Sequence, residues 1–539
     1  MNKKVLSLFS LCLLSSFITS CNKETYTKTQ YTDGLQFELN EKKDGYILTE
    51  NLSNEEEIII PELYKGKPVR EIADEVFIYS EIKSVELPKS LRKIGKKAFF
   101  NATGLTKLEI PNGVTTIENE AFFLNTSLKE IDIPSSVSYI GENAFSHETS
   151  LVKFVVDEKN KTYTSLNNVL YNKDYSTLIN YPLGSKNTTY DINKATKTIS
   201  SYAFYGCSNL TSITIPNSVE TIEYRGLAAL SSLTTITIDL DESNLKTIGE
   251  YAFSENSSLT SFKLPNKVEA LGEYAFYKDR SLTSFSFNNN ENIKEIPRCL
   301  FHSCAGLTTL ILPSNLTSIG DKVFYSCSQL KKLSIPTTVT NIGSYAFYGN
   351  HSITSIEIPE SIKTIKEGCF SSCISLSKFN FHKNLEVIED KAFLGCSAFT
   401  SLDLSKTKIN SIGASAFYGL TSITSIEFPT TLKNIGEKGF DGGTIAKIKN
   451  LELPEGLETI GAYAFNNYQV LNSVYLPKTI KTIGDYIFLS AGFDQKLSFK
   501  IYTPLSEMPT GVSKNWVRPE ILERVQFNTT LDQYHTLIG

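Results

Sequence analysis

The sequence has little of the residue chemistry from which catalytic sites are built. It contains only five histidines, no H-x-x-x-H pair, no G-x-S-x-G elbow and no phosphate-binding loop. His302 and His351 each follow a recurring phenylalanine, at a position where exposed polar residues are ordinary. The carboxylates are numerous but follow a repeat rather than a paired catalytic geometry. We therefore expect no catalytic residues and no enzymatic activity.

An excess of basic charge and a metal-binding motif are also missing. The formal net charge is -5 at pH 7, whereas a protein that binds nucleic acid needs a basic footprint for the phosphates. Cys369-x₃-Cys373 has no second pair at zinc-finger spacing. We expect no nucleic-acid partner, no metal site and no cofactor.

The apolar run at the start of the chain is short. Val5 to Ile18 is mostly apolar, but a membrane-spanning helix needs about 20 apolar residues. Lys3 and Lys4 precede the run, and the small residues Thr19 and Ser20 follow it. This layout predicts a secretory signal peptide over residues 1–20.

The end of this segment, Ile18-Thr19-Ser20-Cys21, resembles the bacterial lipobox. The resemblance implies that Cys21 is lipidated and becomes the first mature residue, and a triacylated cysteine carries enough acyl chain for stable anchoring. The alternative is an ordinary signal peptide in which Cys21 is incidental. The polar residues 21–33 are expected to form a lipidated, flexible tether. We expect a lipid-anchored protein of the cell envelope, at the outer membrane or cell surface.

A repeated unit dominates the rest of the chain. Ala-Phe or a close variant recurs, and from Phe301 to Phe393 each step is 23 residues. An aliphatic residue followed by proline, as in Ile335-Pro336, and an Ile-Gly pair, as in Ile342-Gly343, recur in phase with it. The recurring phenylalanines are Phe77, Phe99, Phe122, Phe145, Phe204, Phe253, Phe276, Phe301, Phe324, Phe347, Phe370, Phe393, Phe417, Phe440, Phe465 and Phe488.

Residues 330–352 show how one unit is expected to fold. Leu333 and Ile335 alternate with polar residues, which predicts a short strand with one buried side. Pro336 ends the strand because proline has no amide hydrogen for a ladder. Gly343 is expected to permit a turn, and Phe347 to stack on Phe324 and Phe370 of the neighbouring units.

Over about 430 residues the pattern resembles the BspA-like class of leucine-rich repeats. The resemblance implies an α/β-type repeat solenoid that is mainly β, with a parallel β-sheet on one face and short turns or helical segments on the other. We expect an N-terminal β cap over residues 34–57, about 17 repeats over 58–495, and a C-terminal cap over 496–539. Residues 151–198 carry a longer unit, which predicts a hairpin that projects from the stack.

Seven cysteines lie in the repeats, and an odd number cannot all pair internally. Four of them, Cys304, Cys327, Cys373 and Cys396, occupy the slot that Asn125, Asn256 and Asn350 hold in other units. Leucine-rich repeats use Cys or Asn there to pack and to satisfy turn backbone groups, and we favour this role. A 304–327 or a 373–396 disulfide is the geometrically conceivable alternative.

One residue between the two aliphatic residues of each strand should face outward. In the C-terminal third of the array this column is largely acidic, and an acidic row favours a basic or extended protein segment. A merely soluble β surface is the alternative, and aromatic platforms for sugars are scarce in the column. The candidate binding face is Glu357, Asn380, Asp403, Glu427, Glu452 and Tyr475.

These features lead to a functional hypothesis. BspA-like proteins include adhesins for host matrix proteins and neighbouring cells, so the resemblance implies a surface lipoprotein that binds protein ligands. We expect it to be a monomer, with a host extracellular matrix or serum protein as its ligand. The alternative is a non-catalytic envelope scaffold without a host partner. A hydrolase hidden in residues 151–198 is disfavoured, because that segment has no histidine or cysteine.

Overall fold

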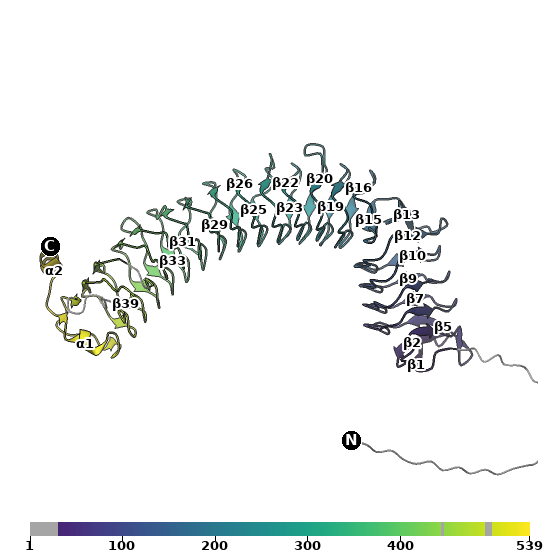
Figure 1. Ribbon diagram of the computed structural model, residues 1–539, viewed down its shortest axis with the longest axis horizontal. Coiled ribbons are helices and arrows are strands. Elements are labelled where there is room, and N and C mark those ends of the chain that lie inside the picture. The colour runs from purple at the N-terminus through teal and green to yellow at the C-terminus, as the bar shows by residue number, and fades with distance from the viewer. Residues whose placement is uncertain (1–30, 444–446, 491–498, 539) are drawn as a thin grey trace, which may run out of the picture.

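The computed structural model describes residues 31–443, 447–490 and 499–538. The predicted signal peptide over 1–20, Cys21, and the tether as far as residue 30 lie outside the described residues. The described chain winds into a long solenoid whose turns stack side by side and curve into an arc (Figure 1). The predicted repeat solenoid is confirmed.

The strands of the L-x-x-I-x-I segments stack in parallel and form what we call the first ladder. Most of these strands alternate in burial because successive side chains point to opposite faces. In β28, for example, Leu333 is buried between exposed Lys332 and Ser334. The strands of the first ladder are β3 (Glu57–Ile59), β6 (Ser84–Glu86), β8 (Lys107–Leu108), β10 (Glu130–Ile133), β12 (Lys153–Val156), β16 (Thr189–Asp191), β18 (Ser212–Thr214), β20 (Thr235–Thr237), β22 (Ser261–Lys263), β24 (Ser284–Ser286), β26 (Thr309–Ile311), β28 (Lys332–Ser334), β30 (Ser355–Ile356), β32 (Lys378–Phe379), β34 (Ser401–Asp403), β36 (Ser425–Glu427), β38 (Asn450–Glu452), β40 (Ser473–Tyr475), β42 (Lys500–Tyr502) and β44 (Val525–Gln526).

A second ladder runs along another side of the solenoid. It begins with an antiparallel hairpin and continues as parallel strands, most of them two residues long. Its strands are β1 (Leu35–Leu39), β2 (Tyr46–Asn51), β5 (Lys67–Ile72, which also pairs with β4, Leu63–Tyr64), β7 (Lys93–Ile94), β9 (Thr116–Ile117), β11 (Tyr139–Ile140), β15 (Thr177–Asn180), β17 (Thr198–Ile199), β19 (Thr221–Ile222), β21 (Thr247–Ile248), β23 (Ala270–Leu271), β25 (Glu295–Ile296), β27 (Ser318–Ile319), β29 (Asn341–Ile342), β31 (Thr364–Ile365), β33 (Val387–Ile388), β35 (Ser411–Ile412), β37 (Asn434–Ile435), β39 (Thr459–Ile460), β41 (Thr482–Ile483) and β43 (Gly511–Val512).

The Ala-Phe turns form the third side, which we call the turn ladder. The amide of Phe324 donates to the carbonyl of Ala346 at 2.8 Å, and the amide of Phe347 donates to the carbonyl of Cys369 at 2.8 Å. The rings stack in the interior: Phe347 lies 5.4 Å from Phe324 and 5.2 Å from Phe370 between ring centroids. The predicted phenylalanine stack is confirmed.

Gly343 is required for a different reason from the predicted one. Its backbone is not in the left-handed region, but a Cβ at this position would lie 2.4 Å from the amide nitrogen of Asp321 in the preceding turn. The left-handed conformation instead falls on Tyr345, with φ of 56°. Glycine therefore permits the close approach of neighbouring turns rather than an unusual turn conformation.

The sequence predicted turns or helical segments on the face opposite the parallel sheet. The structure has turns and two-residue strands there and no helical segments within the described repeats. In the described residues the only helices are α1 (Pro519–Leu522) and α2 (Leu531–Ile538), both beyond the repeats. Neither helix in this part of the chain is long and apolar enough to cross a membrane.

The longer unit at 151–198 forms a three-stranded antiparallel meander of β13 (Tyr163–Leu166), β14 (Val169–Asn172) and β15. The predicted hairpin is confirmed, but the prediction that it projects from the stack is wrong. β15 pairs in parallel with β17, so the meander heads the next stretch of the second ladder. Val169, Leu170 and Tyr171 are each fully buried, because both faces of β14 are covered.

This meander separates two hydrophobic cores. Leu170 packs into a core that extends from Leu35, whereas Val169 and Tyr171 pack into a second core that extends to Ile521. The pairing of the second ladder stops at the same place, between β11 and β13, as it also does between β23 and β25 and between β29 and β31. Figure 1 shows the resulting bend, where the short N-terminal arm meets the longer arc near β12 and β13.

Strand pairing continues past residue 495, where the repeats were expected to end. β42 pairs with β40, β43 pairs with β41, and β44 pairs with β42, all in parallel. Helix α2 follows and contacts β40 of the first ladder.

The seven cysteines of the described residues are free and buried, so the alternative of a 304–327 or a 373–396 disulfide is wrong. Cys327 and Cys373 instead donate from Sγ to the carbonyls of Phe301 and Phe347, each at 3.1 Å. Asn350 donates from Nδ2 to the carbonyl of Phe324 at 2.8 Å in the same slot. Cys and Asn thus satisfy a turn carbonyl of the preceding unit, as the sequence indicated.

Candidate binding face

The predicted binding residues lie on the first ladder in the C-terminal part of the arc. Strand alternation turns them outward: in β34, Leu402 is buried while Ser401 and Asp403 are exposed. Asp403 and Glu427 are direct partners in the parallel pair of β34 and β36, so their carboxylates project from neighbouring strands about 4.8 Å apart. In the middle of the arc, the labels β16, β20, β22 and β26 follow the outer rim in Figure 1, while β19, β23 and β25 lie nearer the inner rim.

Glu357, Asp403 and Glu427 form what we call the acidic row. Each is exposed, and none of them makes an ion pair within the described structure. Like charges on adjacent strands repel one another. A cationic partner would relieve this repulsion, and because the row is exposed the attraction would weaken with rising salt.

Asn380 differs from its acidic neighbours because its side chain is engaged by the fold. Its Oδ1 accepts from the amide of Ile358 at 2.8 Å, and its Nδ2 donates to the carbonyl of Ile358 at 3.0 Å. The side-chain amide of Asn380 therefore takes the place of a backbone partner just beyond the end of β30. Asn380 supports the row and offers less to a ligand than the sequence suggested.

Asp403 keeps its negative charge over a wide pH range. Its Oδ1 accepts from the hydroxyl of Ser405 at 2.6 Å and from the Ser405 amide at 3.0 Å. These bonds, the hydroxyl bond first, lower the pKa of Asp403 because they stabilise the carboxylate.

Tyr475 was expected to be exposed, and this expectation is wrong. The residue is 1% exposed and packs with Tyr502 and Tyr534 beneath α2. Its hydroxyl donates to Glu455 Oε1 at 2.7 Å, and burial is the main reason that its pKa is raised. The strand pattern placed Tyr475 on the outward side correctly, but a helix 56 residues later in the chain returns to cover it.

Glu452 also contacts a residue of α2. Its Oε2 lies 2.7 Å from Nε2 of His535, and both side chains are about half exposed. Ser473 Oγ lies 3.0 Å from the Tyr534 hydroxyl, which ties the same helix to β40. The C-terminal end of the predicted face is therefore occupied by the protein's own helix.

Aromatic side chains are scarce among the outward-facing residues of the first ladder, but they gather along the turn ladder. Tyr251 and Tyr274 stack at 4.6 Å with ring planes 5° apart, and Tyr325 and Tyr348 stack at 4.4 Å with planes 13° apart. Because these rings cover one another's faces, they offer edges rather than open faces to a sugar ring. Within this row His147 lies between Phe123, at 4.5 Å, and Tyr205, at 4.4 Å between ring centroids. Burial lowers the pKa of His147 to about 4, with a smaller contribution from Arg225.

The described residues hold no group of three or more His, Cys, Asp or Glu side chains suited to a metal ion. The geometry is that of an extended strand face with a row of carboxylates.

Stacked parallel strands, ordered turns and a continuous phenylalanine core define a leucine-rich-repeat solenoid. The family model described as "BspA type Leucine rich repeat region" matches residues 70–184, 181–305, 294–410 and 386–501. The chain belongs to this family.

Several solved structures are similar to this chain. A leucine-rich repeat protein from Bacteroides ovatus is 21% identical, with a TM-score of 0.49, and the match covers 87% of this chain and 93% of that one. The pneumococcal vaccine antigen PcpA is 27% identical over 55% of this chain and 73% of its own, with a TM-score of 0.42. A leucine rich cell surface protein from Faecalibacterium prausnitzii is 23% identical over 65% and 93%, with a TM-score of 0.27. No curated protein matches the chain.

Proposed function

We propose that this protein is a lipid-anchored surface protein whose solenoid binds a protein ligand through the acidic row. The observation that carries this proposal is the docking of α2 on the adjoining strands, where His535 lies against Glu452 and Tyr534 packs on Tyr475. A polypeptide segment with a basic and an aromatic side chain is thus already accommodated by this face. The same chemistry on a partner would suit Glu357, Asp403 and Glu427.

The proposed ligand is a host matrix or serum protein, or a protein of a neighbouring cell, that presents a basic segment. Exposed ion pairs contribute little singly, so several carboxylates in a row are needed to select a basic partner. The protein is proposed to act as a monomer without a cofactor and without catalysis.

A capture experiment with host matrix and serum proteins tests the binding role. The chain carrying Glu357→Lys, Asp403→Lys and Glu427→Lys should lose the captured partner. A matched variant with Glu269→Lys, Glu295→Lys and Glu437→Lys changes the same charge at exposed positions away from the row and should retain it. Equal capture by both variants contradicts the proposal.

The anchoring role rests on the sequence Ile18-Thr19-Ser20-Cys21. Metabolic labelling with an alkyne fatty acid should label the wild-type protein and not a Cys21→Ser variant. Protease treatment of intact cells should then remove the repeats. Repeats that survive on intact cells while the label remains on Cys21 would favour the alternative, an envelope scaffold without a host partner.

A further inference from the structure

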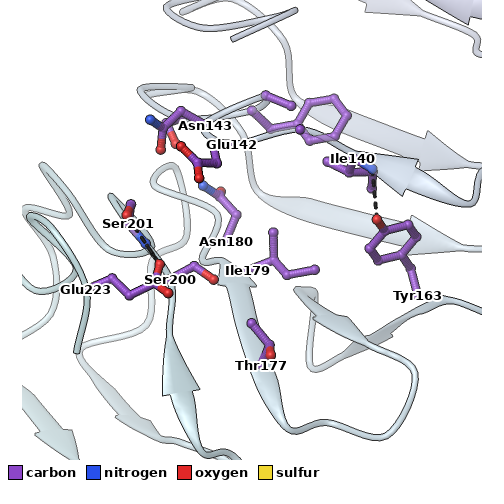
Figure 2. Close-up of a pocket in the computed structure, with 14 residues that line it drawn as sticks. Ile140, Glu142, Asn143, Tyr163, Thr177, Ile179, Asn180, Ser200, Ser201 and Glu223 are labelled. Atoms are coloured by element: carbon purple, nitrogen blue, oxygen red, sulfur yellow. Dashed lines mark hydrogen bonds between the residues drawn. The ribbon is translucent and has the colours of Figure 1, made fainter. Parts of the chain in front are cut away.

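The turn ladder is interrupted where the two cores meet. On either side of the interruption, the backbone amide of the residue in the phenylalanine position donates to the carbonyl of the residue in the alanine position of the next turn. The amide of Phe122 donates to the carbonyl of Ala144, and that of Tyr181 to the carbonyl of Ala203, each at 2.8 Å. Phe145 and Asn180 hold the corresponding positions across the junction, and no such bond joins them in the described structure. A cavity of about 220 Å³ opens at this interruption (Figure 2).

Asn180 lines this cavity and departs from the repeat. The next residue, Tyr181, takes the phenylalanine position and stacks on Phe204 at 5.0 Å, so Asn180 stands in the slot that Ala203 fills one turn later. Asn180 is 4% exposed, and its Oδ1 has no hydrogen-bond partner. A buried amide oxygen without a hydrogen-bond partner destabilises a fold, and alanine would avoid this cost. The repeat architecture alone gives no reason for asparagine here.

Other hydrogen-bond acceptors surround Asn180. Asn143, on the opposite wall, also has a buried Oδ1 without a partner. Glu223 accepts at Oε2 from the amide of Ser201 at 3.0 Å and from its hydroxyl at 3.3 Å. Figure 2 shows the Asn180 side chain directed toward Glu142 and Asn143.

The cavity carries negative charge without a balancing cation. Glu142 and Glu223 are its only charged lining residues, and no Lys, Arg or His side chain contributes to the wall. The side chains of Ile140 and Ile179 supply apolar surface beside these polar groups. The wall therefore combines carboxylate and amide oxygens that accept hydrogen bonds with apolar surface, so it disfavours anions and can pack against methylene groups.

We propose that this cavity binds the ammonium group of a small aliphatic amine. An ammonium has three donors and no acceptor, which complements amide and carboxylate oxygens. The terminal torsion of asparagine is broad, so Oδ1 of Asn180 can turn toward a bound donor. At about 30 Å³ per water the cavity equals about seven waters, the size of a short diamine. This site is independent of the acidic row.

Isothermal titration calorimetry of the full chain with 1,4-diaminobutane tests the site. Saturable binding of one molecule is expected. Asn180→Ala should weaken it at least tenfold without lowering the melting temperature, because alanine suits this slot. Glu223→Gln, which can still accept bonds from Ser201, should also weaken binding at least tenfold. Glu220→Gln, on the same turn outside the cavity, should bind as the wild type does.

Glucose and calcium chloride provide the competing ligand classes, a neutral polyol and a divalent cation, and neither should bind. The inference is overturned if the amine gives no saturable heat, if both cavity variants bind it as the wild type does, or if glucose or calcium binds in its place. If Asn180→Ala does not fold, Glu223→Gln decides the question. The triple lysine variant of the acidic row should keep its affinity for the amine, which separates this test from that of the proposed function.

Discussion

His535 Nε2 lies 2.7 Å from Glu452 Oε2, although the two residues are 83 positions apart in the chain. The contact joins α2 to β38, while Tyr534 of the same helix packs on Tyr475 of β40 at 5.6 Å between ring centroids. The helix thus ends the row of outward-facing side chains on the first ladder. Its attachment can be tested independently of any ligand.

Tyr534→Ala should release α2 from the first ladder. Tyr534 is 1% exposed and is the one buried side chain of the helix, whereas the half-exposed pair of His535 and Glu452 contributes little alone. Hydrogen exchange of residues 531–538 should become faster in this variant. Leu537→Ala is the matched control, because Leu537 is 62% exposed in the same helix. Unchanged exchange after Tyr534→Ala would show that other contacts hold the helix.

Asp279→Asn should stabilise the protein at neutral pH. Asp279 is fully buried, and burial raises its pKa well above the usual range, although the bond that it accepts from the Asn256 amide acts in the opposite direction. The folded state therefore holds the proton more tightly, and stability is lost as the pH rises above the carboxyl group's unfolded pKa. Asparagine already fills this slot at position 256 and carries no charge.

We expect Asp279→Asn to raise the free energy of unfolding by about 1 kcal/mol at pH 7, with a smaller gain near pH 4. Urea unfolding at the two pH values measures this difference. Asp191→Asn changes an exposed carboxylate and should have little effect. A gain that is the same at both pH values would mean that the charge of Asp279 is not the cause.

The seven repeat cysteines should resist alkylation in the folded protein. Burial raises the pKa of Cys207 to about 11 and that of Cys373 to about 12, so few thiolates form at neutral pH. Iodoacetamide labelling followed by peptide mass spectrometry should modify these cysteines only after denaturation. Rapid labelling of any of them without denaturant would contradict the burial described for the turns.

Phe347→Ala should destabilise the solenoid by about 3–5 kcal/mol, because it leaves a cavity between Phe324 and Phe370. Tyr418→Ala removes an aromatic side chain that is 39% exposed and should cost much less. Urea unfolding followed by circular dichroism measures both. Similar losses for the two variants would mean that the phenylalanine stack is not the main source of stability in this region.

Much of the repeat could be predicted because its information is local. Leu333, Ile335, Pro336 and Phe347 each have a role set within a single turn, and the next turn repeats the same arrangement. The outward position of Asp403 follows from the alternation of its strand in the same way. Such features need only the period and the chemistry of short segments.

The features that were missed depend on contacts between distant segments. No residue near Tyr475 signals that Tyr534 will cover it, because the helix that carries Tyr534 lies beyond two further turns. The buried position of β14 did leave a signal: Val169, Leu170 and Tyr171 are consecutive and apolar, which is typical of a strand covered on both faces. Asn180 could also have been noticed, since it breaks the Ala-Phe pattern.

Strand β14 divides the hydrophobic interior into two cores, and this division affects how the solenoid responds to force. In a repeat protein each turn is stabilised by its neighbours, so cooperativity passes along the array from one turn to the next. At the junction, Phe145 and Asn180 do not share the bond that links other turns, and the apolar interior is divided. The solenoid then consists of two rigid arms joined at this junction. Tension along the molecule should change the angle between the arms before it unfolds any repeat.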